Sequence, residues 1–319
     1  MGKLSGTSGL RGNPTVSPLA AILVGVLATA TASIFIRYAQ RDMPSLVIAA
    51  YRLSIASLVL APIAFSRHRL ELRSLTRIEL GLGLLSGFFL AIHFATWISS
   101  LSFTSVASSV VLVSTAPLWV AVLAPFTLRE KVSRLALVGL VLALLGSAVI
   151  ALSDNCTVSA AAIRCPPFSE FVSGTAFLGD LLAVAGALAA AAYLLVGRRL
   201  RGKMSLVPYI FLAYGMGAIV LVGIVAIARE SPLGYRPVAY LWLILLALVP
   251  QLVGHTIINW ALRFLSAAFV AVTMLGEPIG STILAYALLG ETPSVVKVFG
   301  AILILLGIYI AARSEARGS

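Results

Sequence analysis

The sequence predicts an all-α integral membrane protein with ten transmembrane helices, arranged as two inverted five-helix repeats. Three observations support this fold class. Hydrophobic residues make up 60% of the 319 positions and charged residues only 11%, with a mean hydropathy of +1.06, which does not fit a water-soluble surface. The apolar residues form continuous runs of membrane-spanning length. The second half of the chain repeats the pattern of the first.

The apolar runs define the expected spans. A helix needs roughly 20 mostly apolar residues to cross the ~30 Å hydrocarbon layer, whereas the strands of a membrane barrel would alternate polar and apolar residues. The first run exceeds the apolar region of a signal peptide and no A-x-A site ends it, so it is interpreted as a span. In chain order the spans are 17–38, 44–66, 78–98, 103–126, 132–152, 176–197, 205–228, 238–261, 264–289 and 293–313. They leave tails at 1–16 and 314–319 and a connecting loop at 153–175 between repeats at 17–152 and 176–313.

The basic residues predict the orientation of these spans. Sixteen of the 23 Lys and Arg residues fall on the side of the N-terminus and six on the other side, while Arg52 lies inside a span. Because cytoplasmic loops carry an excess of Lys and Arg, both termini are expected in the cytoplasm. The net charge of +12 then belongs to loops that face anionic lipid, and the basic clusters indicate topology rather than nucleic-acid binding.

The two halves match at an offset of 161 residues. Leu and Ala pairs carry little weight in so apolar a chain, but Pro, Glu, Gly and Arg are scarce enough for their agreement to indicate a duplication. The matched pairs are Gly25 and Gly186, Arg37 and Arg198, Pro117 and Pro278, Glu130 and Glu291, Gly139 and Gly300, and Gly146 and Gly307.

The duplication has a topological consequence. Each copy contains five spans, which is an odd number, so the second copy enters the membrane from the opposite side. Inverted repeats are characteristic of secondary transporters, whose halves exchange conformations around a site near the midplane. The sequence therefore predicts a carrier that works by alternating access.

The repeats also resemble a known family. Residues 260–310, with A-L-x-[FY], E-P, L-G-E and paired-glycine elements, look like the second EamA repeat of the drug/metabolite transporter superfamily, and residues 99–150 look like the first. The resemblance covers 17–313 and implies a ten-helix carrier of the bacterial inner membrane that exports amino acids or other small metabolites, with YddG-type amino-acid exporters the nearest group. The first copy departs from the pattern at Thr127 and at Arg129, where the family usually has glycine.

Polar and aromatic residues at membrane depth are the candidates for contact with a substrate, because charge there is rare and usually faces a cavity. Arg52 either snorkels toward the interface, forms a structural ion pair or holds a substrate carboxylate. His93 and His255 occupy corresponding spans, one residue out of register, and either contact a substrate or bond another helix. No other ligand-type residue stands at metal-binding spacing beside them. The candidates are Tyr51, Arg52, His93, Trp97, Thr115, Trp119, Tyr214, His255, Asn259, Trp260 and Glu277.

Glu277 is the unusual member of this set, because its counterpart in the first copy is Ala116. The repeated fold therefore does not require the carboxylate. Three roles stay open: a packing partner for a buried donor, an anchor for a substrate ammonium, and a carrier of a coupling proton.

Two prolines and a glycine are predicted hinges. A proline frees the carbonyl four residues earlier, so Pro117 releases Val113 and Pro278 releases Met274, and spans 4 and 9 are expected to bend around the translocation path. Gly276 allows close helix contact beside the second proline. Glu130 and its counterpart Glu291 are interpreted as structural, each complementing the dipole of the following helix.

Cys156 and Cys165 are the only cysteines and fall in the longest interhelical loop. The predicted orientation places this loop outside the cytoplasm, where thiols pair. A disulfide between them is expected.

The remaining function classes are weighed by their motifs. No H-E-x-x-H, paired-aspartate, G-x-S-x-G or phosphate-binding glycine motif is present, so neither an enzyme nor an ATP-driven pump is predicted, and no cofactor is implied. The expected partners are a small-molecule substrate and membrane lipid. Amino acids with apolar or aromatic side chains are favoured, since intramembrane charges are too few for a phosphorylated ligand. An exporter of lipophilic or cationic drugs and a gated channel remain as alternatives.

Overall fold

The computed structural model describes residues 16–104, 109, 112–153, 157–158, 163–164, 175–289 and 294–318, which form helices joined by short loops, together with two short strands. The helices of the first half are α1 (Pro18–Ala30), α2 (Ala32–Ala39), α3 (Ser45–Arg67), α4 (Arg69–Ser74), α5 (Arg77–Ser100), α7 (Ala116–Thr127) and α8 (Arg134–Ser153). Those of the second half are α10 (Thr175–Arg201), α11 (Leu206–Ala228), α12 (Pro237–Leu246), the π-helix η1 (Ala247–His255), α13 (Thr256–Ala261), α14 (Ala267–Met274), α15 (Glu277–Leu289) and α16 (Val295–Gly318). Strands β1 (Thr157–Val158) and β2 (Ile163–Arg164) pair antiparallel between the halves.

The predicted spans are present as helices. Among the described residues seven helical segments are long and apolar enough to cross a membrane, and three shorter apolar helices cover Ala116–Thr127, Arg134–Val149 and Val298–Ser314. These segments correspond one to one to the predicted spans, which confirms the all-α ten-helix fold. The last helix runs further than expected, because α16 continues to Gly318 through the segment interpreted as a tail. The predicted disulfide between Cys156 and Cys165 lies outside the described residues.

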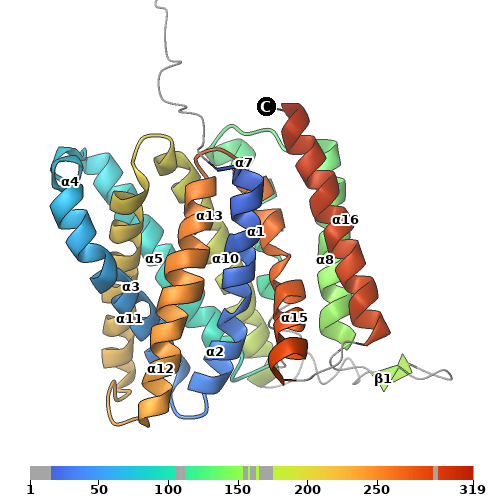
Figure 1. Cartoon of the computed structure of the whole chain (residues 1–319), viewed down its shortest axis with the longest axis horizontal. Coiled ribbons are helices and arrows are strands. Elements are labelled where there is room, and N and C mark those ends of the chain that lie inside the picture. The colour runs from blue at the N-terminus through green and yellow to red at the C-terminus, as the bar shows by residue number, and fades with distance from the viewer. Residues whose placement is uncertain are drawn as a thin grey trace, which may run out of the picture.

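The helices pack as two related halves. α3 contacts α11 and α8 contacts α16, so these helices meet their own counterparts, and α7 contacts α14, which belongs to the counterpart span. The contact of α5 with α10 is repeated by that of η1 with α1. Figure 1 shows α8 and α16 side by side at one end of the molecule and α3 and α11 at the other. One residue contact repeats in the same way. A Cβ on Gly186 would lie 3.0 Å from Thr96, and a Cβ on the matched Gly25 would lie 3.0 Å from Ile257. Ile257 is the residue 161 positions after Thr96.

The crossing of α8 and α16 shows the inversion most directly. A Cβ on Gly139 would lie 2.5 Å from the Gly307 carbonyl oxygen, and one on Gly146 would lie 2.6 Å from that of Gly300. The sequence match pairs Gly139 with Gly300 and Gly146 with Gly307, so the contacts are crossed, as a two-fold relation between antiparallel helices requires. Small residues allow this close approach inside a bilayer.

Span 8 differs from its counterpart by one residue. The helix from Pro237 to Ala261 has 25 residues, whereas α5 from Arg77 to Ser100 has 24. The last residues of the two helices, Ser100 and Ala261, are 161 positions apart, as the repeat requires, but the first residues, Arg77 and Pro237, are only 160 positions apart. The wide turns of η1 accommodate the extra residue, which is what a π-helix does within an α-helix.

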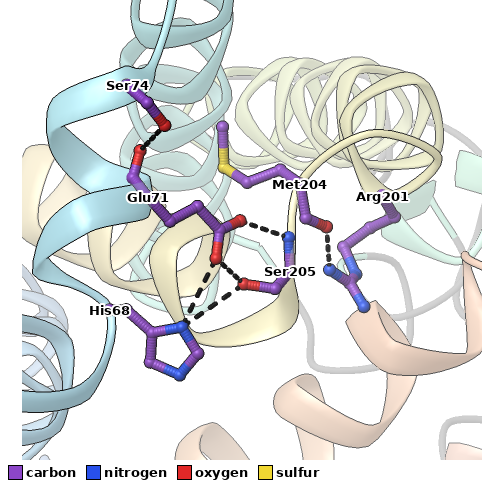
Figure 2. A network of polar contacts seen from close by, with 6 residues as sticks. All are labelled: His68, Glu71, Ser74, Arg201, Met204 and Ser205. Atoms are coloured by element: carbon purple, nitrogen blue, oxygen red, sulfur yellow. Dashed lines mark hydrogen bonds and ion pairs between the residues drawn. The ribbon is translucent and has the colours of Figure 1, made fainter.

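A polar cluster joins α4 to the start of α11 (Figure 2), on the side of the molecule where the C-terminus lies (Figure 1). Glu71 accepts hydrogen bonds from the Ser205 backbone N–H at 2.8 Å and from the Ser205 hydroxyl, and His68 Nδ1 lies 3.4 Å from the same carboxylate. Partial burial raises the pKa of Glu71, but the hydrogen bonds from Ser205 and His68 outweigh it and hold the pKa below its ordinary value. The carboxylate thus caps α11 across a loop.

We expect Glu71→Gln to lower the melting temperature at neutral pH by a few degrees, because the variant loses charge-assisted hydrogen bonds to a helix N-terminus. A carboxylate with a lowered folded-state pKa stabilises the protein above its unfolded-state pKa, and this contribution disappears as the pH falls through the folded-state pKa. The difference between variant and wild type should therefore shrink toward zero below about pH 4. Thermal unfolding in detergent across pH measures it, and a constant difference down to pH 3 would contradict the role of the charge.

Candidate binding site

A cavity lies between the two halves, with about 100 Å³ open to the centres of water-sized spheres. Its wall consists of residues of α1, α2, α3, α5, α7, α10, η1, α14 and α15, together with the turns before α7 and α15. Most of the lining is apolar, including Leu90, Phe94 and Leu194. A few polar side chains face the same space, namely Thr29, Arg52, His93, Ser114, Tyr193, His255 and Glu277. Such a cavity, apolar with few polar groups, is typical of a small-molecule site.

Two broken helices border the cavity. Thr115 N–H donates to Leu112 O and Leu118 N–H to Thr115 O before α7, and Gly276 N–H donates to Thr273 O and Ile279 N–H to Gly276 O before α15. The two sets match at the repeat offset. Spans 4 and 9 were expected to bend, and in the structure two successive tight turns interrupt each of them, the second turn containing the proline. Val113, Pro117 and Met274 line the cavity at these breaks, whereas Gly276 and Pro278 do not.

Arg52 is 1% exposed, so it does not snorkel to the interface. Its Nε donates to Gln251 Oε1 at 2.7 Å, and its Cζ lies 4.1 Å from the centre of the Phe94 ring. Nη1 is buried and has no hydrogen-bond partner in the described part of the chain. Within that part, no Asp or Glu oxygen lies within 4.0 Å of the guanidinium nitrogens. Arg52 is therefore a buried cation with a free donor on a cavity.

Glu277 is the first residue of α15, so its carboxylate complements the N-terminal end of that helix dipole. Its Oε1 is buried without a partner among the described residues. The Thr29 hydroxyl of α1, which lines the same cavity, donates to Val26 O at 2.9 Å. Glu277 and Arg52 both line the cavity, and no ion pair joins them. The corresponding end of α7 begins with Ala116 and carries no acid.

The two histidines have different surroundings. His93 Nδ1 lies 2.9 Å from the Gly186 carbonyl oxygen of α10, and the ring stacks on Trp97 at a centroid distance of 5.8 Å. His255 packs edge-on against Phe94 at 5.6 Å, and its Nδ1 is buried without a partner in the described chain. Both histidines and Trp97 line the cavity. His93 thus meets both predicted alternatives, an interhelical hydrogen bond and a place in the site.

Asn259 and Tyr214 lie behind the cavity wall. Asn259 Nδ2 donates to the Tyr193 hydroxyl and, at 2.7 Å, to the His255 carbonyl oxygen. The Tyr214 hydroxyl lies 3.4 Å from that of Thr256. The contacts of Asn259 fix two residues that do line the cavity, Tyr193 and His255, so Asn259 acts from outside it.

Four predicted site residues lie elsewhere. The Tyr51 hydroxyl donates to Pro232 O at 2.9 Å in a loop. Trp119 Nε1 donates to Thr115 Oγ1 at 3.2 Å, one turn earlier in its own span. Trp260 packs on Phe264 at 4.8 Å. The cavity wall includes neither Tyr51, Thr115, Trp119 nor Trp260, because their faces of the helices turn away from it.

Sequence reasoning missed four polar residues of this region. Thr29, Ser114 and Tyr193 line the cavity, and Gln251 holds Arg52. Gln251 carried a usable signal, since an amide at membrane depth is costly for the same reason as a charge. Thr29 and Tyr193 carried none, because either residue is also common on faces that pack against lipid or other helices.

Glu130 has a structural role, but not the one expected. Its Oε1 accepts from Arg198 Nε at 2.6 Å and its Oε2 from the Ala267 backbone N–H at 3.2 Å. The carboxylate therefore complements the start of α14, in the other half, rather than the start of the following helix α8. Arg129 beside it has φ +59°, the left-handed conformation that the glycine usual at this position adopts without strain. The matched residue Glu291 lies outside the described residues.

Comparisons with known proteins agree with this architecture. The EamA-like transporter family matches twice, over residues 16–152 and 177–313. Two uncharacterized transporters of Archaeoglobus fulgidus are 27% and 24% identical to the chain, over 88% and 92% of it and 93% and 96% of their own lengths. A solved crystal structure shares the fold with a TM-score of 0.72 at 19% identity, covering 94% of this chain and 99% of that one. The two family matches fall on the two halves that the structure relates by inversion, and the chain belongs to the EamA-like transporter family.

Proposed function

We propose that this transporter carries amino acids with apolar or aromatic side chains by alternating access. The observation that supports the substrate class best is the presence of Arg52 and Glu277 in one cavity without an ion pair between them. Buried opposite charges ordinarily pair, because desolvation is costly for each alone. A zwitterion between them compensates both, with its carboxylate on Arg52 and its ammonium on Glu277.

The walls of the cavity fit the rest of such a substrate. Phe94 and Trp97 offer aromatic surface, and Leu90 and Leu194 offer aliphatic surface. The volume suits a small solute, since one water needs only about 10–15 Å³ on the same measure. A phosphorylated ligand would call for clustered Lys or Arg, whereas Arg52 is the only arginine on the described wall.

We place the protein in a bacterial inner membrane with both termini in the cytoplasm, and infer export as the direction. The excess of Lys and Arg in the loops on the side of the termini supports this orientation. The broken helices at Pro117 and Pro278 are the proposed hinges, since each interrupts a span at the cavity and both do so with the same pair of turns.

Export of lipophilic or cationic drugs is the second candidate. The buried Glu277 carboxylate, with an unpaired oxygen, favours it. Arg52 in the same cavity opposes it, because a like charge repels a cation that has no carboxylate of its own.

Uptake of radiolabelled amino acids into proteoliposomes tests the proposal. We expect saturable flux and counterflow of L-phenylalanine or L-leucine. Transport of quaternary ammonium dyes with no amino acid moved would support the drug exporter instead, and single-channel conductance would contradict the carrier.

We expect Glu277→Gln to raise the KM for L-phenylalanine about tenfold or more, because the neutral amide loses the charge-assisted hydrogen bond to the ammonium. The KM or inhibition constant of 3-phenylpropionate, which has the ring and carboxylate but no ammonium, should change less than twofold. Thermal stability measured on the same samples separates binding from packing. If both ligands bind equally more weakly and the melting temperature falls, Glu277 has a packing role. If only the pH dependence of transport is lost, Glu277 carries a coupling proton.

A further inference from the structure

The π-helix η1 places two polar side chains at the site. Gln251 and His255 are four residues apart on it, so they lie close to the same face of its wide turns. Gln251 reaches Arg52, and His255 lines the cavity. The counterpart helix α5, one residue shorter, is a regular α-helix. The extra residue in span 8 therefore belongs to one half only, as Glu277 does.

Unpaired donors are concentrated at this point. Gln251 is 0% exposed, and its Oε1 accepts from Arg52 Nε at 2.7 Å. Arg52 Nη1 and Gln251 Nε2 are both buried and have no hydrogen-bond partner within the described residues. Buried polar atoms in native proteins are almost always paired, so orphaned atoms require an explanation. Here two orphaned donors belong to side chains that one hydrogen bond joins, and one of the two is a cation.

We propose that Gln251 is a positioning residue that aims Arg52 at the carboxylate of the substrate. This inference rests on the proposed function and deepens it by assigning the anionic half of the site. Gln251 holds Nε of the guanidinium, so Nη1 of this cavity-lining arginine is left unpaired to meet the anion. A fixed guanidinium binds a carboxylate with less loss of side-chain freedom than a mobile one.

An amide side chain at position 251 suits this role better than a carboxylate or an apolar side chain. A glutamate there would neutralise Arg52 internally and compete with the substrate carboxylate for it. A leucine would remove the hydrogen bond to Nε and leave the guanidinium free to rotate. Glutamine orients the cation without consuming its charge.

The test compares three ligands on the full-length protein in detergent by calorimetry. L-phenylalanine carries both charges, L-phenylalaninamide lacks the carboxylate, and 3-phenylpropionate lacks the ammonium. We expect Gln251→Leu to raise the Kd of phenylalanine and of 3-phenylpropionate about tenfold, and to leave that of the amide within twofold. Gln251→Glu should raise the Kd of phenylalanine and of 3-phenylpropionate about 100-fold. Gln40→Leu is the matched control, since Gln40 hydrogen-bonds Ser45 at a helix end and does not line the cavity.

The outcomes separate the two levels of the proposal. If Gln251→Leu weakens all three ligands equally, or lowers the melting temperature without changing the ratio of acid to amide affinity, Gln251 has a structural role only and the inference fails. If the wild type binds 3-phenylpropionate and not phenylalanine, the amino-acid function fails while Gln251 is still tested on the carboxylate. If the wild type binds neither phenylalanine nor 3-phenylpropionate, both the amino-acid function and the role of Gln251 are contradicted.

Discussion

Arg52→Leu is expected to reduce transport of L-phenylalanine in proteoliposomes at least about 100-fold. The variant loses the proposed partner of the substrate carboxylate, and removal of one partner of a buried charge pair costs about 2–5 kcal/mol. The variant should still fold. Arg52 has no carboxylate within 4.0 Å in the described chain, so its removal relieves an uncompensated buried cation and orphans only Gln251 Oε1. We therefore expect a change of no more than a few degrees in the melting temperature.

Arg52→Lys separates charge from geometry. Lysine keeps the positive charge but lacks the planar fork that bonds Gln251 and a carboxylate together, so an intermediate loss of about tenfold is expected. Arg236→Leu is the control: Arg236 is 75% exposed in a surface ion pair with Asp42, and its loss should leave transport unchanged. Wild-type rate and affinity in Arg52→Leu would remove Arg52 from the site.

The second large effect concerns stability rather than binding. Gly139→Ala is expected to destabilise the protein by about 1–3 kcal/mol, because the added methyl would lie 2.5 Å from the Gly307 carbonyl oxygen and force α8 and α16 apart. Backbone cannot rotate away as a side chain can. Gly307→Ala should cost a similar amount, since its Cβ would lie 2.5 Å from the Gly139 carbonyl oxygen.

The double variant gives a sharper test of this crossing. If the first methyl already separates the helices, the second costs less, and the two effects sum to less than additivity. Gly223→Ala is the matched control, because it makes the same change inside helix α11 where no atom lies within 4 Å of the new Cβ. It should be neutral or slightly stabilising. Equal melting temperatures for Gly139→Ala and Gly223→Ala would show that the close approach is not needed.

The duplication was predictable from a few scarce residues, and the structure uses them as a two-fold fold would. Gly139 and Gly146 cross-pair with Gly307 and Gly300, and the breaks before Pro117 and Pro278 carry matched turns. These features could be predicted from the sequence because glycine permits a close approach that other residues do not, and proline restricts the backbone whatever its neighbours are. The sequence did not indicate that each proline would accompany a break instead of a bend, since this depends on the turns that precede it.

The site itself was predictable only in part. Arg52, His93, Trp97, His255 and Glu277 line the cavity, as expected of polar and aromatic residues at membrane depth. The remaining candidates lie behind the wall or turn away from the cavity, as described above. The hydrogen bond of Gln251 to Arg52 joins residues 199 positions apart, and no local pattern specifies it.

The sequence by itself determined the spans and the inverted repeat, because the thickness of the hydrocarbon layer sets the length of an apolar run and an odd number of spans sets the inversion. Only the tertiary structure decided which face of each helix meets the cavity. In a soluble helix a polar stripe marks the face turned to water, but here the lipid-facing and core-facing sides are both apolar. The hydrogen bond of Arg52 to Gln251 and the place of Arg52 and Glu277 on one cavity therefore follow from the packing of the two halves, not from any periodicity in the chain.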